Sequence, residues 1–582
     1  MRSNLTDSKS SPTKTRWQAR RERWRDQLSK LDALPQLTIL GLLTGIIAGI
    51  LILLFRLLVE VPLHFILPTH TENFEALSNA WHFGLPVLGA LILGTILQLM
   101  DKQYHAAGVS HVLDRLHNHQ TRMPLGNVVT QLLGGALCLI SGQSVGREGP
   151  AVHLGAGSGS LLGQWLQLPN NSLRPLAGCG VAAAIAACFN TPMAGVIFAM
   201  EVVVMEYSIA GFIPVILAAV AGATINQLMF GSATIFNLPQ NTMGSLLELP
   251  LMAITGLIVA VFAALFIRLQ GICCKHSLNR PVALRFTVAG LLTGCGALIA
   301  PQIMGVGTDT IDSVLLGNMG FSLLLSILAI KLLVTAVSLG VGMPGGVIGP
   351  LLLMGACIGG MAGIIANQLM PESASAVGFY VILGMGAMMG AALNAPLAAM
   401  MAILELTYNP NIIFPSMLVV VVACLTTRWA FGCEGLFQTL LQIQGKKNTF
   451  SSIEHLLSRT GARGLLDTNI QTSAAEISTA QAHQLLAHHP HWIVLESSHR
   501  VLNPGDLAHF LIEACATPDK LLNLEEIPAR RLDMIELEEQ TNLYQALLNM
   551  NCAQVDAAYI SDPQRNKIGI ITREQIDNYY KL

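Results

Sequence analysis

Long apolar runs, interrupted by glycine and proline, occupy most of the chain. The runs 82–100 and 249–267 contain no Asp, Glu, Lys or Arg, and the run 37–59 contains only Arg56. Each is about as long as the ~20 residues that an α-helix needs to cross a bilayer. Other apolar runs are shorter, and broken helices persist in a membrane only where their free backbone groups face protein or water. The pattern predicts an all-α polytopic membrane domain of broken, tilted helices over residues 33–446.

Polar segments flank this predicted domain. Residues 1–32 are rich in arginine and carry no cleavage site of a secretory signal peptide. A basic segment directly before the first span predicts that the N-terminus stays in the cytoplasm. Residues 447–582 have the composition of a soluble protein, and we expect a small cytoplasmic α/β domain there. Its predicted elements are a helix at Gln540–Met550, strands at Asp556–Ile560 and Lys567–Ile571, and a closing helix at Arg573–Tyr580.

Composition narrows the range of functions. Charged residues make up 12% of the chain, about half of the ~25% found in soluble domains. The net charge of −2 gives no basic surface for nucleic acid. The eleven cysteines contain no Cys-x-x-Cys pair, so we expect neither a metal site nor a disulfide framework. No HExxH, GxSxG or Walker motif predicts an enzyme, although a membrane-embedded enzyme or a sensor without transport stays open.

Histidines cluster after the second apolar run, at His105, His111, His117 and His119. Histidine titrates near physiological pH, so we weigh a pH sensor and a metal site against a hydrated loop, and we expect the loop. The same expectation holds for His483, His488, His489 and His491.

The apolar region contains an internal repeat. The sequence FNTPMAG at residues 189–195 recurs as LNAPLAA at residues 393–399, and the same offset aligns Glu201 with Glu405. A second block, at residues 142–159, has matching glycines and prolines 200 positions later. We therefore predict two structural repeats, at about 33–235 and 248–440.

One carboxylate lies at predicted membrane depth. Gly146-Arg147-Glu148-Gly149-Pro150 sits between apolar runs, and Gly346-Val347-Ile348-Gly349-Pro350 is its distorted copy. A charged residue inside a membrane usually marks an ion path, and paired breaks in two repeats are typical of a secondary transporter. The N–H groups at the start of a broken helix carry partial positive charge, which suits an anion. Glycine-mediated helix packing is the alternative explanation of the glycines.

These residues resemble the CLC family of chloride channels and chloride/proton exchangers, and the chain looks like a divergent bacterial-type member. The family's gating motif matches residues 146–150 without change, and its characteristic helices match residues 189–195 and 393–399. The resemblance implies a homodimer in the bilayer of the bacterial inner membrane. Each subunit would pass chloride or another small anion through a pore formed by two inverted repeats. Glu148 would close the outer end of this path and accept the transported proton.

The resemblance also implies the anion-binding positions, which are Gly146, Gly149, Val347, Ile348, Gly349, Ala107 and Phe437. Two of them depart from the family's pattern, because a serine and a tyrosine that offer hydroxyl groups are replaced by Ala107 and Phe437. A hydrogen bond to an anion contributes about 1.5–3 kcal/mol. We therefore expect weak chloride binding at this central site, or a preference for another anion.

The proton pathway departs from the pattern as well. Many exchangers of the family carry an inner glutamate directly after the position of Glu201, and here that residue is Val202, as in the family's channels. Some exchangers lack this glutamate, so a water wire could still deliver protons to Glu148. Proton-coupled exchange and a passive channel therefore both stay open. Glu201 itself is predicted to form hydrogen bonds to helix ends, because the repeat preserves it as Glu405.

The C-terminal segment has a resemblance of its own. Residues 567–575, KIGIITREQ, resemble the end of a CBS repeat, and residues 492–511 could belong to a preceding repeat. Repeats that bind adenine nucleotides often carry an aspartate at the position of Gln575. The resemblance therefore implies a CBS-pair-like domain that stabilises a dimer, and it does not favour a bound nucleotide. We expect no cofactor.

Overall fold

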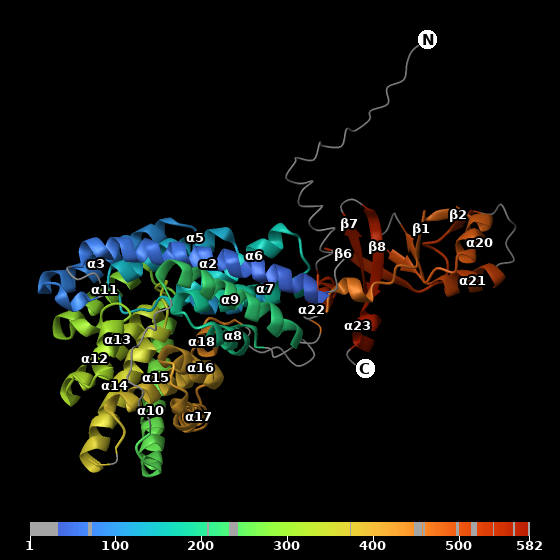
Figure 1. The fold of residues 1–582 in the computed structure, drawn as a ribbon. Helices are drawn as coiled ribbons and strands as arrows, with labels where there is room; N and C mark the ends of the chain where they lie inside the picture. Colours follow the sequence, from blue (N-terminus) through green and yellow to red (C-terminus); the bar gives the residue numbers. More distant parts are fainter. Residues whose placement is uncertain are drawn as a thin grey trace. The chain divides into compact units, whose positions relative to one another are not determined.

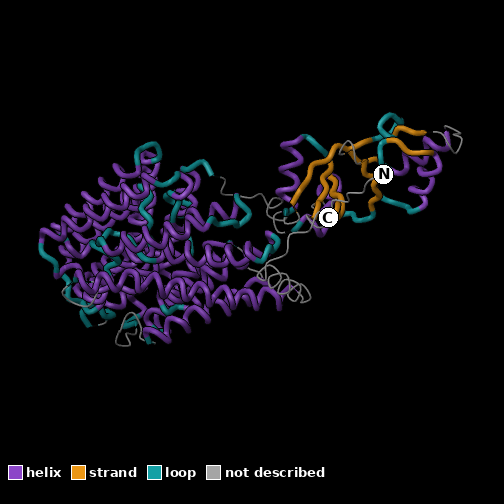
Figure 2. Tube along the Cα trace, turned by 90° about the horizontal axis from the view of Figure 1, so that it is seen from above, coloured by secondary structure: helices purple, strands orange, loops and turns teal. Residues whose placement is uncertain are grey.

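The computed structural model describes residues 33–67, 73–205, 209–231, 243–372, 374–446, 457, 460–495, 500–513, 521–538, 541–562 and 565–579. The predicted basic tail, residues 1–32, lies outside these residues. The chain divides into two compact units, one of residues 1–166 and 174–448 and the other of residues 167–173 and 449–582. Helices make up the first unit, and the described strands all belong to the second (Figure 2).

The helices of the first unit follow one another in two series (Figure 1). The first series is α2 (Ala33–Ile66), α3 (Asn79–Leu99), α4 (Gly108–Asn118), α5 (Leu125–Ile140), α6 (Glu148–Trp165), α7 (Asn170–Phe189), α8 (Pro192–Phe198) and α9 (Ile209–Phe230). The second is α10 (Leu249–Ser277), α11 (Val282–Ile299), α12 (Thr308–Leu315), α13 (Phe321–Gly340), α14 (Ile348–Leu369), α15 (Val377–Leu393), α16 (Pro396–Thr407), α17 (Ile413–Trp429) and α18 (Leu436–Ile443). A π-helical turn, η3 (Ala199–Val204), continues α8.

Short 3-10 helices connect several of these elements. They are η1 (Phe74–Ala76), η2 (Lys102–Tyr104), η4 (Leu246–Glu248), η5 (Pro301–Ile303), η6 (Pro410–Ile412) and, in the second unit, η7 (Ala462–Leu465).

Among the described residues, nine helices are long and apolar enough to cross a membrane, counted by length and composition. Four apolar helices are shorter, at residues 125–140, 192–204, 377–393 and 396–407. Large apolar side chains such as Phe65, Leu99 and Trp429 are exposed along the outer helices. In water so many exposed apolar side chains would be unfavourable, whereas lipid would cover them. The unit is therefore a polytopic helical membrane domain.

Equivalent turns recur in the two series. Gly142 and Gly342, which follow α5 and α13, have φ of 64° and 92°. Asn190 and Asn394, which precede α8 and α16, have φ of 57° and 55°. These left-handed conformations favour glycine and asparagine, so the repeated residues in the sequence mark repeated breaks in the backbone.

Several of the repeated glycines are explained by helix packing. A Cβ at Gly155 in α6 would overlap the carbonyl of Gly180 in α7, and a Cβ at Gly355 in α14 would overlap the carbonyl of Gly384 in α15. Close approach of two helices needs such small residues. The alternative of glycine-mediated packing is thus correct for these positions, whereas Gly146 and Gly346 have another neighbour, which is described below.

Within the second unit, two successive segments of the chain have the same order of helices and strands (Figure 1). The first is β1 (Ile470–Ser473), α20 (Thr479–Ala487), β3 (Trp492–Leu495), β4 (Arg500–Leu502) and α21 (Pro504–Glu513), and the second is β6 (Arg531–Glu538), α22 (Leu543–Ala553), β7 (Ala557–Asp562), β8 (Arg565–Thr572) and α23 (Arg573–Tyr579). In each, the first two strands pair in parallel and the last two antiparallel, in one sheet of order β1-β3-β4-β6-β7-β8. A separate pair joins β2 (Glu476–Ser478) to β5 (Leu521–Asn523).

The elements predicted near the C-terminus are confirmed, with shifts of a few residues at their ends. The predicted helix at 540–550 is α22, the two strands are β7 and β8, and the closing helix is α23. Gln575 has a local partner, because its Oε1 accepts a hydrogen bond from Thr572 N–H at 2.8 Å, and its own N–H lies 3.3 Å from Thr572 Oγ1. This reciprocal arrangement caps the start of α23.

Candidate functional site

The two helix breaks of the repeat meet at Gly146 and Gly346. The N–H of each glycine donates to the carbonyl oxygen of the other, and both N···O distances are 2.7 Å. This short antiparallel bridge lies just before α6 and α14 and brings their N-terminal ends together. The sequence repeat therefore corresponds to a contact between the two series of helices.

Glu148, the first residue of α6, is buried against this bridge and is 1% exposed. Its Oε1 accepts a hydrogen bond from the N–H of Gly349 in α14. A Cβ at Gly146 or Gly346 would overlap the Glu148 carboxylate, and a Cβ at Gly349 would lie 2.9 Å from Oε1. We call these three glycines the glycine pocket. Glycine is needed here because any side chain would occupy the space of the carboxylate.

The second carboxylate oxygen of Glu148 is less well satisfied. Among the described residues Oε2 is buried without a hydrogen-bond partner. The charges of Arg147 and Lys331 are near enough to act on the carboxylate. Burial without a full set of donors disfavours a charged carboxylate, whereas the Gly349 N–H and the two cations favour it. Glu148 can thus change its charge with a modest change in its surroundings.

A cavity of about 320 Å³ lies beside the glycine pocket. It is lined by four of the residues that the sequence predicts for anion binding, which are Ala107, Gly149, Val347 and Phe437, and by Gly346 of the glycine pocket. The other three predicted residues do not line it. Gly146 and Gly349 face Glu148, and Ile348 is buried at the start of α14. The predicted set therefore separates into four residues that line the cavity, two glycines that face the carboxylate, and Ile348, which is buried at the start of α14.

The charged side chains that line the cavity are all positive among the described residues. Lys102, Arg285 and Lys446 line the cavity, and none of its described lining residues is Asp or Glu. Lys446 forms an ion pair with Asp114, with 2.8 Å between Nζ and Oδ2. Nε of Arg285 is buried and has no hydrogen-bond partner among the described residues. A cavity with this lining attracts anions.

The N-terminal end of α4, at Ala107 and Gly108, is held by side chains of α5. Gly108 N–H donates to Gln131 Oε1 at 2.7 Å, and Gln131 Nε2 donates to the carbonyl of Pro344 at 3.0 Å. Asn127 Nδ2 donates to the carbonyl of Ala106 at 3.1 Å. The backbone N–H of Gly108 at this helix end is thus already bonded to Gln131. Sequence reasoning missed Gln131, although a buried amide inside an apolar helix is a signal that could have found it.

Lys331 was also missed. It lies in the middle of the apolar helix α13, is 0% exposed, and donates from Nζ to the carbonyls of Ile303 and Gly305, at 2.8 Å each. The rule that identified Glu148, a charge at membrane depth, applies equally to this lysine. Its ammonium group fixes the loop around η5 and places a positive charge near Glu148.

Glu201 and Glu405 cap each other's helices. Glu405 accepts from the N–H groups of Met193 (2.9 Å) and Ala194 (2.7 Å) at the start of α8. Glu201 accepts from those of Leu397 (3.3 Å) and Ala398 (2.7 Å) at the start of α16. A carboxylate at a helix N-terminus satisfies free N–H groups and the helix dipole. The prediction that Glu201 bonds to a helix end is confirmed. Val202 beside it is buried among apolar residues.

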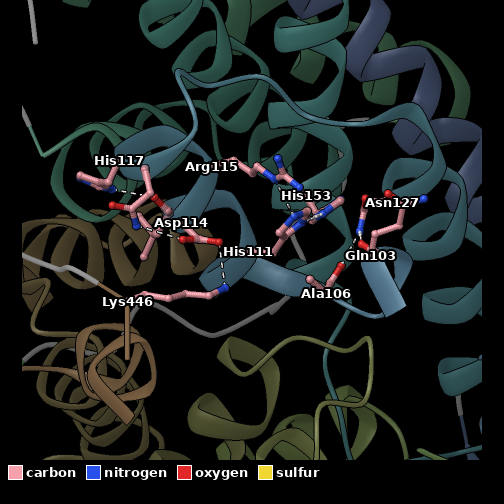
Figure 3. A network of polar contacts seen from close by, with 11 residues as sticks. Gln103, Ala106, His111, Asp114, Arg115, His117, Asn127, His153 and Lys446 are labelled. Atoms are coloured by element: carbon pink, nitrogen blue, oxygen red, sulfur yellow. Dashed lines mark hydrogen bonds and ion pairs between the residues drawn. The ribbon is translucent and has the colours of Figure 1, made fainter. Parts of the chain in front are cut away.

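The histidine prediction is partly wrong. The expected loop contains the helix α4, and His111 on this helix is 3% exposed. Figure 3 shows His111 between Arg115 and His153, which lies on α6. His117 bonds within α4, to the carbonyl of Leu113 at 2.7 Å. In the second unit His483, His488, His489 and His491 are exposed, although His483 lies on the helix α20 and not in a loop. The described residues contain no group of three or more His, Cys, Asp or Glu that could hold a metal ion.

The fold, together with the contact between the N-terminal ends of α6 and α14, defines the class of protein. It is a polytopic helical membrane protein built from two repeats. Residues 89–428 match the model of the family described as voltage gated chloride channel, and the chain belongs to this family, the CLC proteins.

Relatives and solved structures agree with this assignment. A putative chloride channel protein ClcB-like of Ralstonia nicotianae is 29% identical over 368 residues, which cover 61% of this chain and 84% of that protein. The H(+)/Cl(-) exchange transporter ClcA of Vibrio vulnificus is 28% identical over 394 residues, 65% of this chain and 83% of that protein.

Among solved structures, a slow cyanobacterial Cl−/H+ antiporter has a TM-score of 0.64 at 22% identity and covers 72% of this chain and 100% of its own. A eukaryotic CLC transporter has a TM-score of 0.58 at 19% identity and covers 93% and 97%. These structural likenesses establish the fold, which includes two inverted repeats of broken helices.

Proposed function

We propose that the protein exchanges chloride, or another small anion, for protons across a bacterial inner membrane, with Glu148 as gate and proton acceptor. The observation that carries the proposal is the position of Glu148, whose carboxylate fills the glycine pocket between the N-terminal ends of α6 and α14. Helix N-termini bind anions, so a carboxylate and a chloride ion compete for the same donors.

Competition of this kind couples the two ions. When Glu148 is charged and lies in the glycine pocket, its Oε1 occupies the Gly349 N–H. When a proton neutralises the carboxyl group, its attraction to the helix end weakens, and the side chain can leave the pocket. An anion can then take its place. Each proton that binds therefore makes room for an anion, and each anion that enters favours the neutral Glu148.

The cavity beside the pocket supplies the path for the anion on one side of the membrane. Lys102, Arg285 and Lys446 would draw anions in, and Ala107, Val347, Phe437 and the backbone near Gly149 would line the central site. The described lining at Ala107 and Phe437 offers no hydroxyl donor. Backbone N–H groups would therefore provide most hydrogen bonds, and chloride would bind weakly.

The proposed orientation in the membrane is supported by the chain's connectivity and charge. Lys446, which lines the cavity, is the last described residue before the chain continues toward the second unit. If that unit is cytoplasmic, as its soluble composition favours, the cavity opens to the cytoplasm. The arginine-rich segment 1–32 supports a cytoplasmic N-terminus on the same side. We further propose a homodimer, with residues 447–582 as a CBS-pair-like domain that contributes to it without a nucleotide.

A passive channel of the same fold is the second candidate. It is favoured by Val202, which cannot carry a proton, and by the name of the Ralstonia nicotianae relative, a putative chloride channel protein. The two candidates differ in whether anion and proton movements are linked.

Purified protein in liposomes separates them. With a chloride gradient and no proton gradient, an exchanger moves protons in the direction opposite to chloride and so builds up a proton gradient. A pH-sensitive dye reports the proton movement, and a chloride electrode reports the anion flux. We expect proton uptake that stops when the chloride gradient is removed. Robust chloride flux without proton movement would replace exchange by the passive channel, and flux of neither ion in nitrate, fluoride, sulfate or chloride would refute transport.

A further inference from the structure

Three side chains form a buried chain of hydrogen bonds between α4 and α6. Arg115 Nε donates to His111 Nε2 at 3.1 Å, and His111 Nδ1 lies 2.7 Å from His153 Nε2. The two imidazole rings stack with 5.0 Å between their centroids, and His153 is 0% exposed. Figure 3 shows the three side chains meeting at this point.

The hydrogen bonds fix where the protons are. A guanidinium group can only donate, so His111 Nε2 must accept from Arg115 and carries no proton. The proton of His111 is therefore on Nδ1 and is donated to His153 Nε2. The proton of His153 is then on Nδ1, which is buried and has no partner among the described residues. Both rings are neutral in this arrangement, and each still has one nitrogen that can take up a proton.

This pair lies where an exchanger needs a proton donor. His111 lines the same cavity as Gly149 and Gly346, which adjoin the Glu148 carboxylate. The described lining contains no carboxylate, and its imidazole side chains are those of His105 and His111. His105 Nε2 bonds to the carbonyl of Met100 at 3.1 Å. Of these two histidines, His111 is the one in contact with a second base.

We propose that His111, backed by His153, is a proton-holding site on the wall of the cavity and supplies the protons that reach Glu148. The proposal rests on the proposed exchange function. It adds the residue that takes protons from the cavity, whose described lining contains no carboxylate.

The proton transfer balances as follows. When Arg115 Nε moves away, a hydronium ion in the cavity gives one proton to His111 Nε2 and becomes water. The pair then holds one positive charge, which moves between the rings when the Nδ1 proton of His111 crosses to His153 Nε2 and back. His111 Nε2 returns one proton to a cavity water, from which it passes to the Glu148 carboxylate. Both rings are then neutral again, and Arg115 can rebind. His153 acts as a positioning residue that spreads the charge.

The surroundings of the two histidines disfavour a lasting positive charge, so a proton bound there stays only briefly. The charged and titratable groups that act on His111 are Asp114, Arg115 and His119 from α4 itself, Lys446 after α18, and His153 from α6. Burial, and then the charges of Arg115 and Lys446, lower the pKa of His111 to about 3, and the Asp114 carboxylate, which is bonded to Lys446, acts against this shift. A proton bound there is therefore readily passed on.

Liposome assays on the full chain test the site, with chloride flux and proton flux measured on the same preparation. In His111→Gln we expect chloride flux close to that of the wild type and proton flux reduced roughly tenfold or more. His117→Gln, on the same helix, is the matched control and should retain both fluxes. Wild-type proton coupling that persists unchanged in His111→Gln would overturn the proton-holding site alone. Chloride flux without proton coupling in the wild type would overturn the exchange function, and this proposal with it.

Two further variants keep the test valid if His111→Gln does not fold. In Arg115→Gln the pair is intact and has lost a neighbouring cation, so the pH of half-maximal proton flux should rise by about one unit. In His153→Gln the side-chain amide can still bond to His111 but cannot share its charge, so proton flux should fall while chloride flux is retained. A merely structural role would alter both fluxes together and leave the pH profile in place, and that result would contradict the proposal.

Discussion

The carboxylate of Glu148, in the first repeat, accepts a hydrogen bond from the backbone N–H of Gly349, in the second. One half of the molecule thus supplies the side chain and the other half supplies the donor. Because the bridge between Gly146 and Gly346 fixes the distance between the two helix ends, the carboxylate has a defined position. Displacement of this side chain should therefore change transport.

The substitution Gly146→Ala should displace the Glu148 carboxylate in this way. The nearest atoms to a Cβ at Gly146 all belong to the Glu148 carboxyl group, which can move, whereas a Cβ at Gly346 would also meet the backbone nitrogens of Gly149 and Glu148. We expect Gly146→Ala to fold, to raise chloride flux severalfold and to lower the ratio of protons to chloride. Gly84→Ala, where a Cβ meets nothing within 4 Å, is the control. Unchanged flux and coupling in Gly146→Ala would mean that the seated carboxylate does not close the path.

The reciprocal helix caps make a prediction about stability. Glu405→Ala removes the acceptor of two N–H groups at the start of α8. Hydrogen bonds to charged groups contribute about 1.5–3 kcal/mol, so the variant should unfold more easily by an amount of this order. Thermal unfolding in detergent measures it. Glu434→Ala, which loses only an exposed bond to Gln442, is the comparison, and equal stability of the two variants would contradict the capping role.

Restoring a hydroxyl group tests the central anion site. Ala107→Ser places a donor on the cavity wall next to the N-terminal end of α4. A gain of about 1.5–3 kcal/mol corresponds to a rise in chloride affinity of roughly tenfold to a hundredfold. Titration calorimetry of purified protein reports the change, with Ala430→Ser outside the cavity as control. If the affinities of the two variants agree, the anion does not bind at Ala107.

A pH dependence is expected at α12, which is not among the candidate spans. Burial, with a smaller effect of the Asp309 carboxylate, raises the pKa of Asp312 to about 6. The unfolded chain has a value near 3.9, so the folded state favours the neutral acid. The stability that this group contributes is complete below about pH 4 and is lost as the pH rises through 6.

Asp312→Asn stays neutral at every pH. It should therefore raise the unfolding temperature at about pH 8 and leave it nearly unchanged at about pH 4, in a comparison of thermal unfolding curves with the wild type. A gain of the same size at both pH values would show that the carboxyl group's ionisation is not the cause.

The sequence predicts the parts of this structure that depend on local pattern. Apolar runs and glycine-proline breaks indicate the helices. The repeated FNTPMAG-like segment shows that Glu201 and Glu405 occupy equivalent positions, and two acids kept at one offset indicate a common role. Glu148 is recognisable because an ionisable residue at membrane depth usually marks a functional site.

Contacts between distant segments could not be predicted in this way. Gln131 bonds to Gly108 and to Pro344, which is 213 residues away, and nothing in the apolar pattern of α5 identifies those partners. The same holds for His111, whose neighbour His153 lies 42 residues further along the chain. A cluster of histidines in sequence resembles a hydrated loop until the fold brings a second buried base against one of them.

Glu148→Ala in liposomes tests the account most directly, with chloride and proton fluxes recorded together. The variant has no carboxylate to fill the glycine pocket and none to carry a proton. We expect that chloride still crosses, at least as fast as in the wild type, and that a chloride gradient no longer moves protons. Proton movement that remains coupled to chloride in this variant would contradict the role of Glu148 as gate and proton acceptor.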